Sequence, residues 1–160
     1  MGQNHSIFSG SMLPMDSVSY VDALSFCDKL NRNPLYLPPQ LDDAIFDLPS
    51  LEQWQFCAKA GQVFQYAGSA QLDEVGWFVE NASGLLQKVA QKKANAWGLF
   101  DMSGNIWEWT KSNDEQFAES VGGSWLDNAE SCRISSKRKL KKDFKSLDQG
   151  FRMILQLVKA

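Results

Sequence analysis

Residues 98–112 read GLFDMSGNIWEWTKS, the most distinctive stretch of the chain. A turn of the form Asp-x-x-Gly-Asn, from Asp101 to Asn105, leads into a short segment that we expect to be a strand. Side chains alternate across a strand, so one of Trp107 and Trp109 should fill the core while the other faces a partner or a groove. Glu108, between them, could serve acid–base chemistry, a metal ion or a buried network. General acid chemistry is the weakest of these, because no second catalytic group is identifiable.

Two helices are predicted in the first part of the chain, over residues 17–33 and 48–61. Ser19 with Asp22, and Ser50 with Gln53, have the spacing of capping boxes that begin helices. Apolar residues then recur at helical spacing, and Trp54 falls in the apolar stripe of the second helix. Gly61 is a suitable stop for that helix.

The rest of the chain is expected to be rich in loops, with a surface loop at 35–49. Candidate strands are 76–79, 105–110 and 151–158, and 121–125 resembles a strand edge entered through glycines. The basic run at 137–145 is expected in a solvated loop; an anion-binding or nucleic-acid patch is the weaker alternative, since no aromatic platform accompanies it. The predicted fold class is α+β, with two helices packed on a small antiparallel sheet in one domain, residues 1–160.

Composition excludes several classes of function. The chain has 160 residues and a net charge of −3, so binding to nucleic acid or to a membrane surface is not expected. No apolar run approaches the ~20 residues that cross a bilayer, and no signal peptide is seen, so the compartment stays open. His5 is the only histidine, and the three cysteines form no CxxC pair, which argues against zinc and against Ser-His-Asp or Cys-His catalysis.

Several segments in one order resemble the formylglycine-generating enzyme, or sulfatase-modifying factor, family. They are MGQNHSIFSG (1–10, with His5 where proline is common), VSYVDALSFCDKLN (18–31), LPSLEQWQFCAKAG (48–61), NAWGLFDMSGNIWEWT (95–110), VGGSWLDNAESCR (121–133) and GFRMI (150–154). The resemblance implies a C-type-lectin-like fold with long ordered loops. It also implies strands upstream of residue 1, so we expect a shortened domain, a fragment or half of a split subunit.

Enzymes of this family oxidise a sulfatase cysteine to an aldehyde with oxygen and copper, which two cysteine thiolates hold. Those thiolates lie five residues apart after the GGS motif, where this chain has Asp127 and Cys132. A carboxylate cannot replace a thiolate toward Cu(I), so copper is not expected. If the chain were active, Cys132, Ser124 and Arg152 would carry the reaction.

The resemblance also bears on the pairing of the cysteines. Spacing from Gly123 puts Cys132 at the second copper position, whereas spacing to 150–152 puts it at a structural cysteine, the alignment that we favour. Its family partner lies one residue from Cys57, so a disulfide is an alternative to the two reduced, neighbouring thiols that we expect. Cys27 should be free and buried, because its partner position holds Met153.

The family's calcium site carries over onto the opening motif. Asp101 and Glu108 would be side-chain ligands, and Gly104 and Ile106 would give carbonyl oxygens, a donor set that suits Ca²⁺. The alternative is that both acids satisfy backbone donors in a tight loop without metal.

A scaffold without its thiolate pair favours a non-catalytic recognition module for a protein, peptide or glycan. Its loops would be 111–120 and 126–148, and the expected ligand-contacting residues are Trp109, Trp125, Asp127 and Arg133. One variant of this hypothesis is a display protein diversified by a retroelement. Two competing hypotheses are a formylglycine-generating oxidase and an accessory subunit. The subunit would form a stable homo- or hetero-oligomer or expose an apolar sheet edge.

Overall fold

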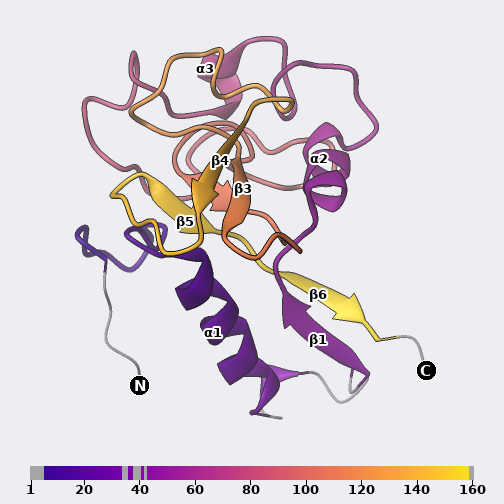
Figure 1. The fold of residues 1–160 in the computed structure, drawn as a ribbon. Helices are drawn as coiled ribbons and strands as arrows, with labels where there is room; N and C mark the ends of the chain where they lie inside the picture. The colour runs from indigo at the N-terminus through magenta and orange to yellow at the C-terminus, as the bar shows by residue number, and fades with distance from the viewer. Residues whose placement is uncertain (1–5, 34–35, 38–40, 42, 159–160) are drawn as a thin grey trace.

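The computed structural model describes residues 6–33, 36–37, 41 and 43–158. Its elements follow the order α1 (Tyr20–Asn31), β1 (Ala44–Asp47), α2 (Leu51–Lys59), α3 (Leu72–Val75), β2 (Trp107–Trp109), β3 (Phe117–Val121), β4 (Lys137–Lys141), β5 (Gln149–Phe151) and β6 (Ile154–Leu157). The molecule is therefore α+β, with long loops between α3 and β2 (Figure 1). His5 and half of the opening stretch 1–10 that carried the resemblance lie outside the described residues.

Both predicted helices form, and both begin at their predicted caps. Ser19 and Asp22 make the reciprocal hydrogen bonds of a capping box at α1, and Ser50 and Gln53 make them at α2. Helix α2 ends one residue earlier than predicted, because Ala60 takes a left-handed backbone with φ of 46° just before Gly61.

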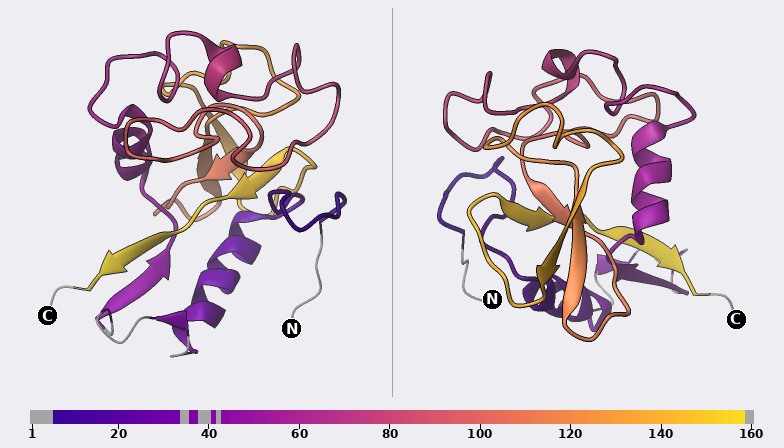
Figure 2. Two further views of the ribbon diagram at one scale, coloured as in Figure 1. Left: turned by 180° about the vertical axis from the view of Figure 1, so that it is seen from behind. Right: turned by 45° about the horizontal axis from the view of Figure 1, so that its top comes forward.

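The central sheet has four strands in the order β4-β3-β2-β5. Strands β4, β3 and β2 are antiparallel neighbours, whereas β2 and β5 pair in parallel, so the expectation of a wholly antiparallel sheet is wrong at this edge. A separate antiparallel ribbon, β1–β6, projects away from this sheet beside α1 (Figures 1 and 2). The predicted strand 151–158 is thus divided at Arg152 and Met153 between two sheets.

Four local predictions fail. Residues 76–79 form no strand. The predicted surface loop 35–49 contains β1, and the predicted ligand-presenting loop 111–120 contains most of β3. The basic run contains β4, the edge strand of the central sheet. In β4, Lys137 pairs with Glu119 at 2.7 Å and Lys139 with Asp114 at 2.9 Å, so partners on or beside β3 neutralise its charge.

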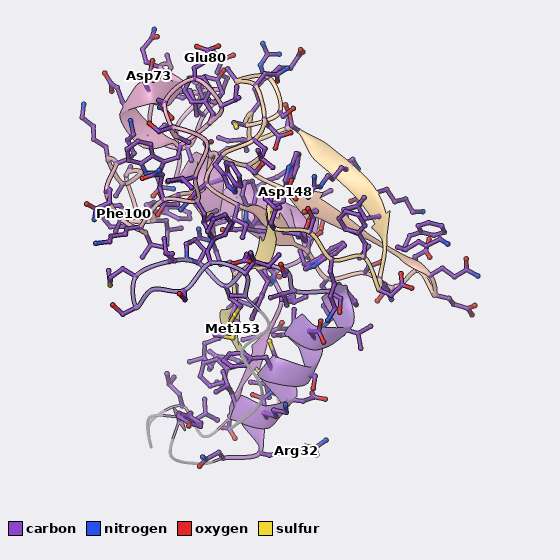
Figure 3. All side chains as sticks on the ribbon, turned by 90° about the vertical axis from the view of Figure 1, so that its left-hand side faces the viewer. Arg32, Asp73, Glu80, Phe100, Asp148 and Met153 are labelled. Carbon is purple, nitrogen blue, oxygen red and sulfur yellow. The ribbon has the colours of Figure 1, made fainter. Side chains whose placement is uncertain are left out.

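Four apolar clusters make up the core. One lies between α1 and the sheet around Trp109, and a second lies under α2 around Trp54. The other two lie in the loop-rich half, around Phe78 with Cys132 and around Ile106 with Trp125. Figure 3 shows these two halves of the molecule, with Asp73 on α3 and Glu80 and Phe100 on the loops of one half, and Arg32 and Met153 on the half built around α1.

Candidate functional site

Glu108 is the centre of a buried polar network in the middle of β2. The guanidinium of Arg152 approaches its carboxylate with two nitrogens, at 2.8 Å from Nη2 to Oε1 and 2.9 Å from Nε to Oε2. The indole Nε1 of Trp54 donates to Oε2 at 2.6 Å. Burial lowers the pKa of Arg152, but the charge and hydrogen bonds of Glu108 outweigh it, so the net pKa is raised. Both carboxylate oxygens are therefore committed within the protein.

Asp101 lies beside this network with one oxygen unused. Its Oδ2 accepts the backbone N–H of Ala90 at 2.8 Å, whereas its buried Oδ1 has no hydrogen-bond partner in the described part of the chain. Burial raises the pKa of the Asp101 carboxyl and the Glu108 charge adds to it, against the lowering effects of the Ala90 N–H and Arg152.

The predicted calcium donors do not fit a single ion in this conformation. Glu108 already faces a guanidinium, and a divalent ion within ~2.5 Å of its oxygens would adjoin that positive charge. The Gly104 carbonyl accepts the N–H of Ile106 at 2.9 Å. No group of three or more His, Cys, Asp or Glu residues in the described ranges is arranged to hold a metal. Of the two predicted side-chain ligands, Asp101 has an oxygen without a partner and Glu108 does not. Calcium stays a prediction.

Four of the predicted residues do meet in one place. Asp101, Ile106, Glu108 and Arg152 line a single cleft of about 420 Å³, together with Phe100 and Phe151. The motif and the GFR segment, more than forty residues apart in sequence, meet because β5 pairs in parallel with β2. Gly104 does not line the cleft; its φ of 82° and its close approach to the Trp77 carbonyl leave no room for a side chain.

A second group of predicted residues lies apart from this cleft, at the base of the loop 124–136. Asp127 Oδ2 accepts hydrogen bonds from the indole of Trp107, at 2.8 Å, and from the hydroxyl of Ser124. Cys132 is fully buried and packs against Gly123. Burial raises the pKa of the Cys132 thiol to about 12, and the charge of Asp127 adds to the effect. The thiol is therefore protonated at neutral pH and unsuited to nucleophilic or copper chemistry.

The three residues of the enzyme hypothesis do not lie in one place. Arg152 lines the cleft beside Glu108, whereas Ser124 and Cys132 lie together in the loop 124–136. A two-thiolate copper site does not fit either, because the side chain that takes the place of the first thiolate is Asp127, already bonded to Trp107. All three cysteines are free, as expected, and Cys27 is buried. Cys57 and Cys132 belong to different core clusters.

The expectation that one of Trp107 and Trp109 faces outward is wrong. Trp107 and Trp109 are both buried, because loops and α1 cover both faces of β2. Trp109 donates to the Val18 carbonyl at 2.9 Å and Trp107 lies under the guanidinium of Arg138. Trp109 therefore offers no surface to a ligand here.

Of the other predicted ligand-contacting residues, only Arg133 is exposed, paired loosely with Glu130 at 3.5 Å. Trp125 is also buried, edge-on to Phe8, and Asp127 is half-buried.

Sequence reasoning missed Trp54 as a partner of Glu108, since its spacing indicated only an apolar stripe. The one available signal was the buried motif glutamate itself, which requires donors. No helix in the described residues has the length and apolarity of a membrane span.

Comparisons with known proteins agree with this architecture. The family model described as sulfatase-modifying factor enzyme 1-like domain matches residues 1–157. Chaperone protein LppX of Paenibacillus barcinonensis is 28% identical, with 96% of this chain and 74% of that protein covered. Inactive C-alpha-formylglycine-generating enzyme 2 of Mus musculus is 26% identical over 88% of this chain and 48% of its own length. Among solved structures, Treponema denticola variable protein 1 has a TM-score of 0.82 at 23% identity, covering 96% and 77% of the two chains. This chain thus spans about three quarters of one curated relative and about half of the other.

Proposed function

The chain belongs to the family of sulfatase-modifying factor enzyme 1-like domains, and we propose that within it this protein is a non-catalytic module that recognises a protein, peptide or glycan. One observation carries the proposal: Glu108 and Cys132 are both committed to holding the fold. The Glu108 carboxylate is bound by Arg152 and Trp54, and the Cys132 thiol is buried. A scaffold that holds these two groups in this way is suited to binding.

The proposed recognition surface is the loop 124–136, which internal hydrogen bonds hold while some of its side chains are exposed. Asn128 Oδ1 accepts the backbone N–H of Ser131 at 3.1 Å, and the Ser136 hydroxyl donates to the Glu130 carbonyl at 2.7 Å. Leu126 and Arg133 are exposed on this loop. A loop held in this way presents an apolar and a cationic contact without losing much conformational entropy when it binds.

The relatives support the same interpretation. One bears the name of a chaperone and another is named as an inactive member of the family. Both descriptions are of proteins that bind or have lost catalysis, so neither favours an oxidase over a recognition module in this chain.

The catalytic alternative is tested by incubating the protein with Cu(I), oxygen and a sulfatase-type cysteine peptide, and following the mass of the peptide. We expect no aldehyde, because Asp127 replaces one thiolate and the Cys132 thiol is protonated. The Cys132→Ala variant, run in parallel, should give the same result. Conversion by the wild-type protein that disappears in this variant would make the chain an oxidase and end the proposal.

The binding half is tested on peptide and glycan arrays with wild-type protein, Arg133→Ala and Arg32→Ala. Arg32, exposed at the end of α1, is the matched control because it removes the same charge outside the recognition loop. Ligands retained by the wild type should bind Arg133→Ala about fivefold or more weakly, as expected for one lost charged contact, and Arg32→Ala normally. Equal binding by all three proteins would show that the loop 124–136 is not the recognition surface.

A further inference from the structure

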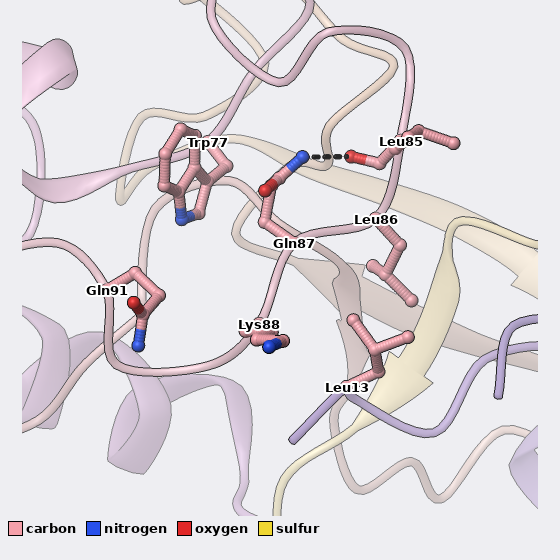
Figure 4. A pocket seen from close by; sticks show the side chains of 7 residues that line it. All are labelled: Leu13, Trp77, Leu85, Leu86, Gln87, Lys88 and Gln91. Atoms are coloured by element: carbon pink, nitrogen blue, oxygen red, sulfur yellow. Dashed lines mark hydrogen bonds between the residues drawn. The ribbon is translucent and has the colours of Figure 1, made fainter. Parts of the chain in front are cut away.

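A second, separate pocket lies between the loop 77–91 and the N-terminal segment (Figure 4). Its volume is about 500 Å³, within the range of about 300–1,000 Å³ usual for small-molecule sites. Leu13, Trp77, Leu85 and Leu86 form its apolar walls, and Gln87, Lys88 and Gln91 supply its polar atoms. None of these residues belongs to the cleft at Glu108 or to the recognition loop.

The walls of this pocket are held in place by the motif that dominates the sequence. Asn105 is buried, and its side chain bonds both backbone groups of Gln87, each at 3.1 Å. Its backbone N–H donates to the Trp77 carbonyl at 2.7 Å, and the Val89 N–H donates to the Met12 carbonyl at 2.8 Å. Asn105 therefore holds both Trp77 and the loop 85–91, and the N-terminal segment is tied to that loop. The pocket exists before any ligand arrives.

Trp77 brings an unused hydrogen-bond donor to this site. Its buried Nε1 has no acceptor among the described residues. In Figure 4 the indole nitrogen lies on the side of the ring that faces Gln91 and Lys88. The ammonium of Lys92 lies 4.2 Å from the ring centroid and draws electron density from it, which strengthens the N–H as a donor. A buried donor without a partner costs about 1–3 kcal/mol, so an acceptor that reaches it is favoured.

The charges around the pocket specify the kind of acceptor. No lining residue is acidic, and Lys88 is exposed at the rim, with no ion pair or hydrogen-bond partner described for it. Lys92, over Trp77, adds a second positive charge nearby. An anionic acceptor is favoured by both lysines and by the indole N–H, while the leucines favour an apolar group beside it.

We propose that this pocket binds a carboxylate attached to a compact apolar group, with the apolar group between Leu13, Leu85 and Leu86 and the carboxylate at Trp77 and Lys88. Such a ligand is either a small free amphiphile or an apolar residue next to an acidic one in a peptide. The site is distinct from the recognition loop 124–136, so it stands or falls separately from the proposed function.

The test follows the indole N–H signals of the protein by proton–nitrogen NMR during titration with sodium octanoate, acetyl-Leu-Asp and, as a neutral probe, 1-octanol. The chain has six tryptophans, and Trp77→Phe identifies the signal of interest by its loss. We expect one or both carboxylates to move the Trp77 signal in a saturable way and octanol to leave it nearly in place. The carboxylate that binds more tightly identifies the source, free amphiphile or peptide.

Two variants separate this site from non-specific binding. Lys88→Gln, followed by the Trp77 indole signal, and Trp77→Phe, followed by the backbone amide signals of Gln87 and Lys88, should each weaken carboxylate binding about fivefold, the effect of one lost hydrogen bond or charge. Lys59→Gln, an exposed lysine on α2 outside the pocket, should not. The five remaining indole signals of Trp77→Phe report whether the fold is intact. Failure of both carboxylates to move the Trp77 signal, or affinity unchanged in both pocket variants, would overturn the proposal.

Discussion

Among single residues, Glu108 joins three segments that are far apart in the sequence. It lies on β2, accepts from Trp54 on α2 and pairs with Arg152 just after β5. A carboxylate in such surroundings is stable only while its donors remain, because an unpaired buried charge costs several kcal/mol. The same bonds that fix the Glu108 carboxylate also occupy both of its oxygens.

Replacing Glu108 with glutamine should therefore destabilise the fold strongly. The neutral amide leaves the Arg152 guanidinium without its counter-charge, and we expect a loss of about 3 kcal/mol in the free energy of unfolding, measured by urea titration. Glu80→Gln is the matched control, since Glu80 is exposed on a loop, and should change stability by less than about 0.5 kcal/mol. Similar losses in the free energy of unfolding of the two variants would mean that the Glu108–Arg152 pair contributes no more to stability than an exposed glutamate.

The candidate site was predictable only where residue type and the family resemblance agreed. Asp101, Ile106, Glu108 and Arg152 do share a cleft, but the sequence did not reveal that Arg152 would neutralise Glu108. That choice of partner depends on the parallel pairing of β2 with β5, a long-range contact. The predicted role of Trp109 depended on one face of β2 being open, and both faces are covered.

Among the elements, the helices were predictable because their signals are local. Ser19 with Asp22 and Ser50 with Gln53 lie three residues apart, and each pair closes its own capping box. Strand β4 was missed because its lysines resemble a solvated loop, although charged residues are also a usual way to protect an edge strand. No local signal could identify β1 either, because its partner β6 is more than a hundred residues away.

The cap of α1 gives a prediction about pH. Burial raises the pKa of the Asp22 carboxyl, but hydrogen bonds from Lys145 and Ser19 outweigh it and bring the pKa to about 2, below the 3.8 of an unperturbed aspartate. A lowered native pKa contributes stability above pH 3.8 that is lost as the pH falls toward 2. The melting temperature of Asp22→Asn should therefore be lower than that of the wild type at pH 7, and the difference should shrink toward pH 2.

Asp28→Asn is the matched control on the same helix, since the Asp28 side chain is exposed and none of the hydrogen bonds described involves its carboxylate. This variant should keep the wild-type melting temperature at pH 7. A difference between Asp22→Asn and wild type that stays constant from pH 7 to pH 2 would contradict the role assigned to the ionised carboxylate.

At the level of the whole molecule, the β1–β6 ribbon is the part least enclosed by the rest. Each of its strands has one partner, and because α1 lies along the other edge of β1, strand β6 leaves the open edge; the ribbon extends away from the central sheet (Figure 2). Asn31 ties its inner side to α1 through two hydrogen bonds to the backbone of Phe46. Its outer side carries Leu157, which is 64% exposed, and Val158, which is 51% exposed. Apolar side chains gathered at an open strand edge favour association with another chain.

We therefore expect the protein to self-associate through this ribbon. Light scattering coupled to size-exclusion chromatography, over about a hundredfold range of concentration, should show an average mass that rises above that of one chain, as mass action requires. Leu157→Lys should lower that mass at every concentration, because a charge at the strand edge opposes pairing. Leu126→Lys is the control, an exposed leucine in the recognition loop that carries the same change. If wild type and both variants all keep the mass of one chain at the highest concentration, the ribbon is not an interface between copies. If both variants lower the mass equally, association involves more of the surface than the ribbon edge.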